Sequence, residues 1–382
     1  MSARKIAQWH EAGVIDAATR DRLLAYEDTH ARPLVLWAVW GIGALAIGLG
    51  FVSVVAANWE DIPGLVRLGV HLALIAGLLV LLFFREAQLA AKSPWATEAL
   101  AFITAALGLT FFGHLGQVYQ TSSPLWQPLA VWLALFAPLL LLTGRGWPTA
   151  LAVVGGMVWT AWEYVDAMTG YRISDYGPGL SLWLGTVLAL PIVLALAGGW
   201  MRARSQRPDF WRRVEQLALA YAAALASAAC AYASIGVFGQ EGPLDSGLAT
   251  LAGGGLAMLT GLALAAARPG TSGRMAGAII AGAGLATLLA PAVDDLDVPA
   301  ALLFMMLWAG IAAAALAAHW RGVFQLAVGV IALRLIILSF ELAADLLTSG
   351  FGLILAGVMI LGVAWTAVRV SKRFAPPSGD DA

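Results

Sequence analysis

Residues 64–84 read GLVRLGVHLALIAGLLVLLFF, an apolar run that contains a single charged residue, Arg67. A helix that crosses a membrane needs about 20 predominantly apolar residues. The whole chain of 382 residues has a similarly apolar composition, since 60% of it is hydrophobic and only 12% is charged. A soluble domain carries about 25% charged residues. The composition therefore predicts an all-α, polytopic bundle of transmembrane helices and excludes a soluble enzyme, a disulfide-stapled secreted domain and a disordered chain.

Apolar runs between charged residues or Gly/Pro breaks predict about 12 spans of this length. They lie near residues 34–57, 64–84, 96–116, 127–143, 148–164, 179–199, 215–237, 247–267, 275–293, 298–318, 323–344 and 349–369. The loops between them are short, so we expect function to reside in the helices, the short loops or the N-terminal segment.

The 22 Lys and Arg residues predict the orientation of these spans. Nearly all of them fall in loops on the side of the N-terminus, whereas the loops of the opposite side are acidic. Cytoplasmic loops carry such an excess of Lys and Arg, so both termini are expected in the cytoplasm. Five segments follow from this reading: a cytoplasmic amphipathic helical hairpin (1–33), a first six-span half (34–199), a basic cytoplasmic linker (200–214), a second six-span half (215–370) and a disordered cytoplasmic tail (371–382).

The N-terminal segment reads as two short helices. Gly13 is a favoured residue for ending the first, and Asp16 is a good cap for the second. Leu23, Leu24 and Tyr26 would form the apolar side of the second helix. Such a hairpin would either lie on the inner membrane face or dock a cytoplasmic protein.

Small residues spaced four apart allow helices to pack closely within a membrane. Three such rows occur, at Ala44 and Gly48, at Gly253, Ala257 and Gly261, and at Gly277 and Ala281. They predict close structural packing of helices.

Ionisable residues inside a span are costly and mark candidate sites. Arg334 lies midway along the eleventh span, with Glu341 two turns later and Asp345 one turn beyond. About 10.5 Å of helix rise separates Arg334 from Glu341, which makes direct pairing marginal without a neighbouring helix or water. With His71 of the second span, these residues form a predicted midplane polar site for an ion, a proton or an anionic headgroup. The structural alternative for Arg334 and Glu341 is an interhelical salt bridge, with Asp345 at the outer surface, and for His71 it is a hydrogen bond to a neighbouring helix.

The turn after the third span is polar but uncharged. Its donors and acceptors suit contact with a sugar or a headgroup, which predicts an outer vestibule; an interfacial turn that satisfies its own backbone is the alternative. The vestibule residues would be His114, Gln117, Tyr119, Gln120, Trp126 and Gln127.

Motifs of soluble catalysis are absent from the sequence, with no G-x-S-x-G, Walker loop, H-E-x-x-H or C-x-x-C. Five scattered histidines and a lone Cys230 suggest no metal site, and no cofactor is expected. The net charge of −1 offers no basic surface for nucleic acid.

Three stretches resemble the DUF2157 family of predicted bacterial membrane proteins: WHEAGVID at 9–16, AANWED at 56–61 and GQVYQT at 116–121. The resemblance covers roughly residues 5–145. It implies a bacterial inner membrane and brings no established activity, so no catalytic role is carried over.

The favoured hypothesis is a transporter or a translocator of lipids or headgroups, whose partners would be membrane lipids and a small-molecule, ionic or lipid-linked substrate. The alternative is a scaffold or sensor that recruits a cytoplasmic protein through residues 1–33. An intramembrane enzyme acting on a lipid-linked substrate through His114 or the outer acids is the third and least favoured hypothesis.

Overall fold

A computed structural model describes residues 9–30, 62–170, 177–238 and 247–342, with single positions elsewhere (6, 46, 242, 244 and several between 358 and 373). The described residues divide between two compact units, Met1–Arg67 and Leu68–Ala382. The predicted first and twelfth spans (34–57 and 349–369) and the tail lie almost wholly outside the described residues. Asp345 and the row at Ala44 and Gly48 lie outside them as well. The count of twelve spans and the orientation of the termini therefore remain predictions.

In the first unit, the predicted boundaries of the N-terminal helices are confirmed. Gly13 takes a left-handed φ of +70°, and its N–H donates to the carbonyl of His10 over 3.0 Å. Helix α2 (Ala17–His30) begins after Asp16, whose Oδ1 accepts a hydrogen bond of 2.8 Å from the Thr19 backbone N–H. Glycine tolerates the left-handed conformation that stops a helix, and the carboxylate satisfies a donor that the first turn leaves free.

The apolar side expected for α2 is not formed, because apolar residues do not gather on one face of this helix. With about 100° of turn per residue, Arg20 falls between Leu23 and Leu24 around the helix axis. The prediction of an amphipathic second helix is therefore wrong for α2.

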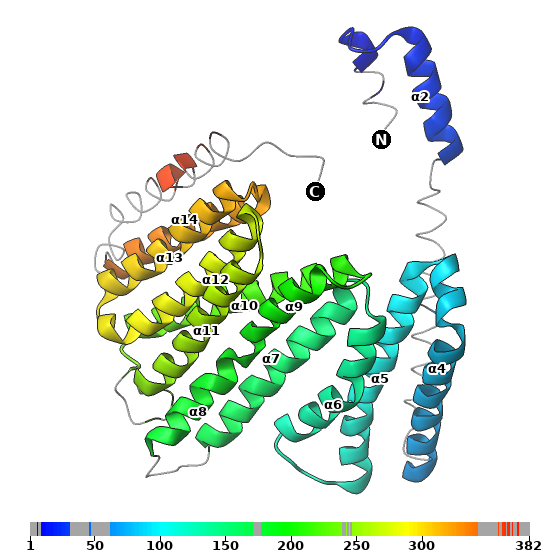
Figure 1. Ribbon diagram of the computed structural model, residues 1–382, viewed down its shortest axis with the longest axis horizontal. Coiled ribbons are helices and arrows are strands. Elements are labelled where there is room, and N and C mark those ends of the chain that lie inside the picture. Colours follow the sequence, from blue (N-terminus) through cyan, green and yellow to red (C-terminus); the bar gives the residue numbers. More distant parts are fainter. Residues whose placement is uncertain are drawn as a thin grey trace. The chain divides into compact units, whose positions relative to one another are not determined.

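The second unit is helical throughout its described residues, which confirms the all-α prediction (Figure 1). In chain order its elements are α4 (Gly64–Lys92), α5 (Pro94–Tyr119), α6 (Trp126–Thr143), α7 (Trp147–Gly170), α8 (Pro178–Ala189), η1 (Leu190–Val193), α9 (Leu194–Arg202), α10 (Pro208–Ser234), α11 (Gly247–Ala267), α12 (Thr271–Leu289), η2 (Ala290–Val293), α13 (Asp297–Ala317) and α14 (Arg321–Leu342). Proline opens α5, α8 and α10, at a position where its missing N–H costs no helical hydrogen bond.

Within these described residues, 9 helices are long and apolar enough to cross a membrane. They are α4, α5, α6, the continuous α8–α9, α10, α11, α12 with η2, α13 and α14. Helix α7 occupies the position of the fifth predicted span, but Glu163 and Asp166 lie near its end and it is not among the nine. Pro191 and Pro291 fall in the 3₁₀ turns η1 and η2; a proline cannot donate the hydrogen bond that would continue an α-helix.

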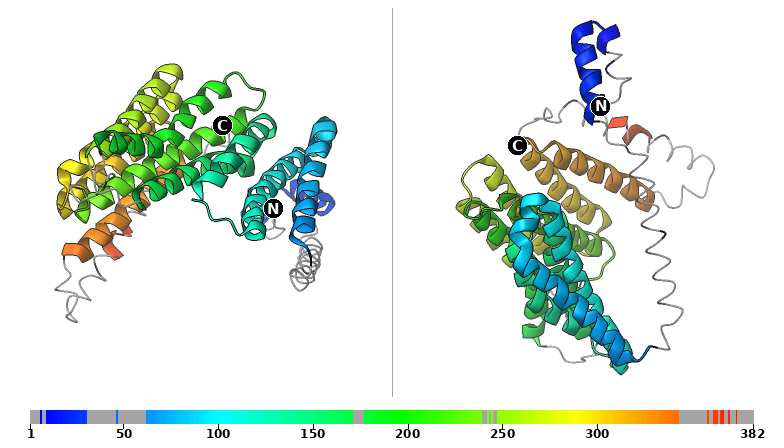
Figure 2. Two further views of the ribbon diagram at one scale, coloured as in Figure 1. Left: turned by 90° about the horizontal axis from the view of Figure 1, so that it is seen from below. Right: turned by 90° about the vertical axis from the view of Figure 1, so that its right-hand side faces the viewer.

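Helix α10 packs against four other helices of this unit, α7, α9, α12 and α13. Figure 2 shows the helices from two further directions. Its buried residues recur every four positions along one stripe, at Val214, Ala218, Ala222, Ala226 and Cys230. Small side chains on this stripe allow neighbouring helices to approach closely.

Helices α11 and α12 make the most extensive helix–helix contact of the described chain. A Cβ atom added at Gly261 would lie 2.3 Å from the Ala281 nitrogen, and one at Gly277 would lie 2.5 Å from the Gly261 oxygen. Any larger residue would force the backbones apart. The close packing predicted from the rows at Gly253–Gly261 and at Gly277 and Ala281 is thus confirmed.

Candidate functional site

Two histidines from adjacent membrane helices contact each other. Helix α4 carries His71 and α5 carries His114, and their Nδ1 atoms lie 3.3 Å apart. The Nε2 atom of His71 lies 3.0 Å from the carbonyl oxygen of Leu107. Because a carbonyl can only accept, this Nε2 carries the hydrogen, and the Nδ1 of a neutral His71 is an acceptor. It follows that His114 donates its Nδ1–H to His71.

The surroundings of this pair are largely apolar. His114 is 9% exposed, and His71 meets the ring of Phe111 edge-on at 5.4 Å between centroids. Protonation of both rings would set two N–H groups against each other across this contact, so the contact itself is compatible with no more than one further proton. The geometry of the His71–His114 pair therefore accommodates at most one proton beyond the neutral state.

This pair joins residues that sequence reasoning assigned to different sites. His71 was predicted for the midplane site and His114 for the outer vestibule, since a sequence does not reveal which faces of two helices meet. The other polar side chains of the turn are not brought into one pocket: Gln117, Tyr119, Gln120 and Gln127 are exposed. Gln120 adopts a φ of 49° as the left-handed end of α5, so it serves the turn itself.

The Arg334–Glu341 pair lies within α14. The Nη1 atom of Arg334 and the Oε1 atom of Glu341 are 2.8 Å apart, with the side chains 11% and 35% exposed. The expectation that a second helix or water must bridge them is wrong, because two long side chains span the two turns directly. Among the described residues, no contact connects this pair to His71.

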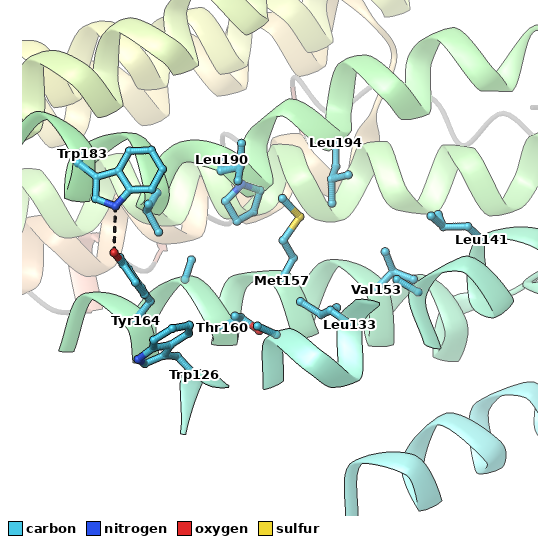
Figure 3. A pocket seen from close by; sticks show the side chains of 15 residues that line it. Trp126, Leu133, Leu141, Val153, Met157, Thr160, Tyr164, Trp183, Leu190 and Leu194 are labelled. Carbon is cyan, nitrogen blue, oxygen red and sulfur yellow. Dashed lines mark hydrogen bonds between the residues drawn. The ribbon is translucent and has the colours of Figure 1, made fainter. Parts of the chain in front are cut away.

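Trp126 faces a cavity of about 470 Å³ between α6, α7 and the α8–α9 helix (Figure 3). The cavity walls are aliphatic and aromatic. At one end, the Trp183 indole N–H donates to the Tyr164 hydroxyl over 3.1 Å, and the Trp126 ring meets Tyr164 edge-on at 5.1 Å. Trp126 is thus separated from His114, with which it was predicted to form one vestibule.

A buried carboxylate closes the turn between α6 and α7. Glu98 is 2% exposed. Its Oε2 accepts from the Arg145 backbone N–H over 2.7 Å, and its Oε1 accepts from the backbone N–H and the hydroxyl of Thr149 over 3.0 and 2.8 Å. A Cβ at Gly146 would lie 2.9 Å from Oε1, so this turn requires glycine there. Glu98, although it belongs to α5, therefore caps the N-terminus of α7.

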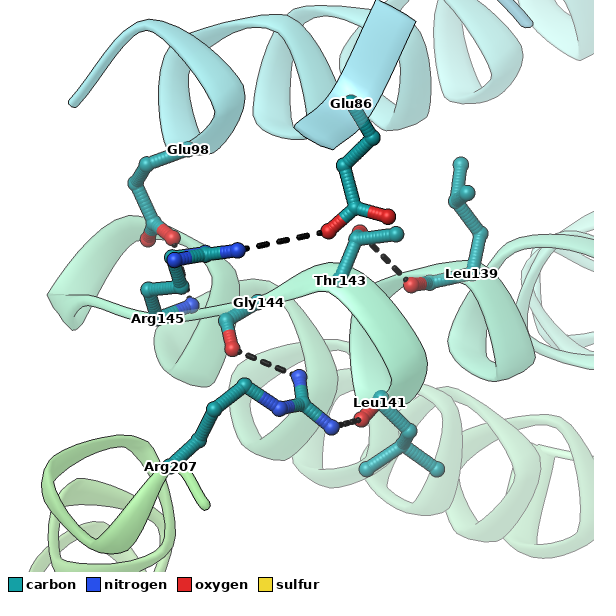
Figure 4. A network of polar contacts seen from close by, with 8 residues as sticks. All are labelled: Glu86, Glu98, Leu139, Leu141, Thr143, Gly144, Arg145 and Arg207. Carbon is teal, nitrogen blue, oxygen red and sulfur yellow. Dashed lines mark hydrogen bonds and ion pairs between the residues drawn. The ribbon is translucent and has the colours of Figure 1, made fainter. Parts of the chain in front are cut away.

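Arginines surround the same turn (Figure 4). Arg145 pairs with Glu86 at 3.4 Å. Arg207 donates from Nη1 to the Gly144 carbonyl over 2.8 Å and from Nη2 to the Leu141 carbonyl over 2.7 Å. Sequence reasoning missed this network; the Gly-Arg-Gly triplet at 144–146 between two helices was its only signal.

Groups able to hold a metal ion do not occur in the described part of the chain, where no three His, Cys, Asp or Glu side chains come together.

Comparison with known proteins bears on the first third of the chain. Residues 7–149 match the family model described as predicted membrane protein (DUF2157). The match covers less than half of the chain. It confirms the resemblance seen over about residues 5–145, and the matched residues include both histidines of the pair as well as Glu98 and Thr149. Neither a curated protein nor a solved structure matches the chain. Family and helices together make this a multi-pass membrane protein.

Proposed function

We propose that this protein is a membrane transporter in which the His71–His114 pair binds and releases a proton. The observation that carries the proposal is the 3.3 Å contact between the two Nδ1 atoms, made by residues of two membrane-spanning helices. Ionisable side chains within spans are expensive to insert and commonly mark ion or proton pathways. Histidine is the side chain best suited to exchange protons near neutral pH.

The other features considered as functional sites give weaker support for a function than the histidine pair does. Arg334 and Glu341 neutralise each other within one helix, which suits a structural role. The cavity beside Trp126 has almost no polar lining, so a path for lipid headgroups finds no support in it. The alternative of a scaffold that recruits a partner through residues 1–33 depended on an apolar side of the second N-terminal helix. Helix α2 has no such side, so this alternative is less well supported.

The test measures proton flux through the purified, full-length protein in liposomes. A pH-sensitive dye is enclosed in the vesicles, and a potassium diffusion potential drives protons inward. We expect acidification with the wild-type protein. His71→Gln and His114→Gln each reduce it to the level of protein-free liposomes, because glutamine keeps hydrogen bonding but binds no proton.

The matched control is His319→Asn, which removes a histidine from the turn after α13, where a φ of 58° favours asparagine. This variant should acidify the vesicles like the wild type. Flux that persists in both His71→Gln and His114→Gln would overturn the proposal, as would wild-type vesicles no more permeable to protons than empty ones.

A further inference from the structure

Leu141, at one end of the apolar cavity between α6, α7 and α8–α9, is hydrogen-bonded through its backbone to an arginine. Leu141 lines the cavity, and its carbonyl oxygen accepts the 2.7 Å hydrogen bond from Nη2 of Arg207. The guanidinium of Arg207 also donates a hydrogen bond to the Gly144 carbonyl oxygen. The cavity end marked by Leu141 in Figure 3 is therefore the place where Arg207 contacts α6 in Figure 4.

Among the described residues, no carboxylate forms an ion pair with Arg207, although Glu86 lies near enough to attract it. Glu86 pairs with Arg145, and Glu98 accepts from Arg145 and Thr149. Arg207 is half-buried and has two neutral carbonyls as acceptors. Burial lowers the pKa of Arg207, repulsion from Arg145 adds to this effect, and attraction to Glu86 partly opposes it. An anion placed beside Arg207 would offset both costs.

The cavity itself suits a hydrocarbon chain. Thr160, a polar residue of its wall, already donates its hydroxyl to the Gly156 carbonyl over 2.8 Å. From Trp126 to Leu141, α6 rises by about 22 Å. An acyl chain occupies about half of the roughly 30 Å hydrocarbon core, so a chain that enters at Leu141 fits along the cavity.

We propose that this cavity binds one anionic phospholipid, with an acyl chain between α6, α7 and α9 and its phosphate beside Arg207. Charge complementarity selects the headgroup: guanidinium groups bind phosphate oxygens strongly, and basic pockets between transmembrane helices recognise anionic headgroups. Arg213 strengthens the positive potential here, since its Nη1 donates to the Arg145 carbonyl over 3.1 Å. This lipid site lies apart from the His71–His114 pair and does not depend on the proposed function.

The test is native mass spectrometry of the full-length protein, titrated with phosphatidylglycerol or with phosphatidylcholine. The wild type should bind one phosphatidylglycerol more tightly than phosphatidylcholine. Arg207→Gln should weaken phosphatidylglycerol binding roughly fivefold, the usual contribution of one arginine near a membrane surface, and leave phosphatidylcholine binding unchanged. Arg207→Lys, which keeps the charge, should retain the preference.

Two further variants separate this site from general effects. Ala137→Phe places a ring in the cavity and should weaken the binding of both lipids. Arg204→Gln removes an equal charge three residues away, where the side chain is exposed and lies over the Trp200 ring, and should bind like the wild type. The proposal is overturned if Arg207→Gln and Arg204→Gln reduce binding equally, if folded Ala137→Phe retains its lipid, or if the wild type does not distinguish the two lipids. Thermal unfolding of each variant identifies loss of fold.

Discussion

Glu98 should be among the residues on which the stability of the described helices depends most. Glu98→Ala removes the acceptor of three hydrogen bonds and leaves the buried N–H groups of Arg145 and Thr149 unsatisfied. A hydrogen bond to a charged group contributes about 1.5–3 kcal/mol, but bonds to one carboxylate do not add fully. We expect the free energy of unfolding to fall by about 2–4 kcal/mol, because each buried N–H group left unsatisfied costs about 1–3 kcal/mol.

Glu98→Gln tests the geometry of this network more finely. Its carboxamide oxygen can keep both bonds from Thr149, whereas its NH₂ group then faces the N–H of Arg145. The expected loss is about 1–2 kcal/mol, as for a removed helix cap. Reversible unfolding of the full-length protein in mixed micelles measures both variants, with Glu163→Ala, at the far end of α7, as a control within about 0.5 kcal/mol of wild type. A Glu98→Ala protein as stable as this control would refute the reasoning.

Three further predictions concern packing and charge. Gly277→Ala should destabilise the protein by about 1–3 kcal/mol, because its Cβ would meet the Gly261 oxygen at 2.5 Å. Gly282→Ala, on the open side of the same helix, should instead be neutral or stabilising by up to about 1 kcal/mol in the same unfolding assay. Glu341→Gln leaves the guanidinium of Arg334, whose side chain is 11% exposed, without a carboxylate partner. The free energy of unfolding should therefore fall, and replacing both residues by leucine should restore part of the lost stability. Hydrogen bonds from Thr19, first from its side chain and then from its backbone N–H, hold the pKa of Asp16 below its ordinary value of 3.8. Its capping of α2 should therefore persist from pH 7 to 5 and be lost only as the pH falls below about 3.8, which amide exchange in the first turn of α2 will show.

The helices could be predicted well from the sequence because their signals are local. Apolar runs bounded by charges place most of the helices from α4 to α14 within about four residues, but α4 and α7 continue past their predicted ends and α10 begins before its predicted start, because a helix can extend beyond its apolar run into charged residues. The stop at Gly13 and the cap at Asp16 follow from single-residue conformational preferences. The rows of glycine and alanine predicted close packing. They could not show that α11 and α12 are the helices that meet.

The candidate site could be predicted only in part because it depends on contacts distant in sequence. His71 and His114 were each recognised as unusual, but 43 positions separate them, and no periodicity reveals that their faces meet. The partners of Glu98 lie 47 and 51 residues away. Arg334 and Glu341 share one helix, and here the error came from treating helix rise as the distance between flexible side chains.

The contact between His71 and His114 is the central claim, and solid-state NMR of histidine-labelled protein in bilayers tests it directly. At a pH where both rings are neutral, a hydrogen bond between the two Nδ1 atoms predicts a ¹⁵N–¹⁵N coupling that joins the two side chains and disappears in His114→Gln. A wild-type spectrum that lacks this coupling, with His71 unchanged by His114→Gln, would contradict the account.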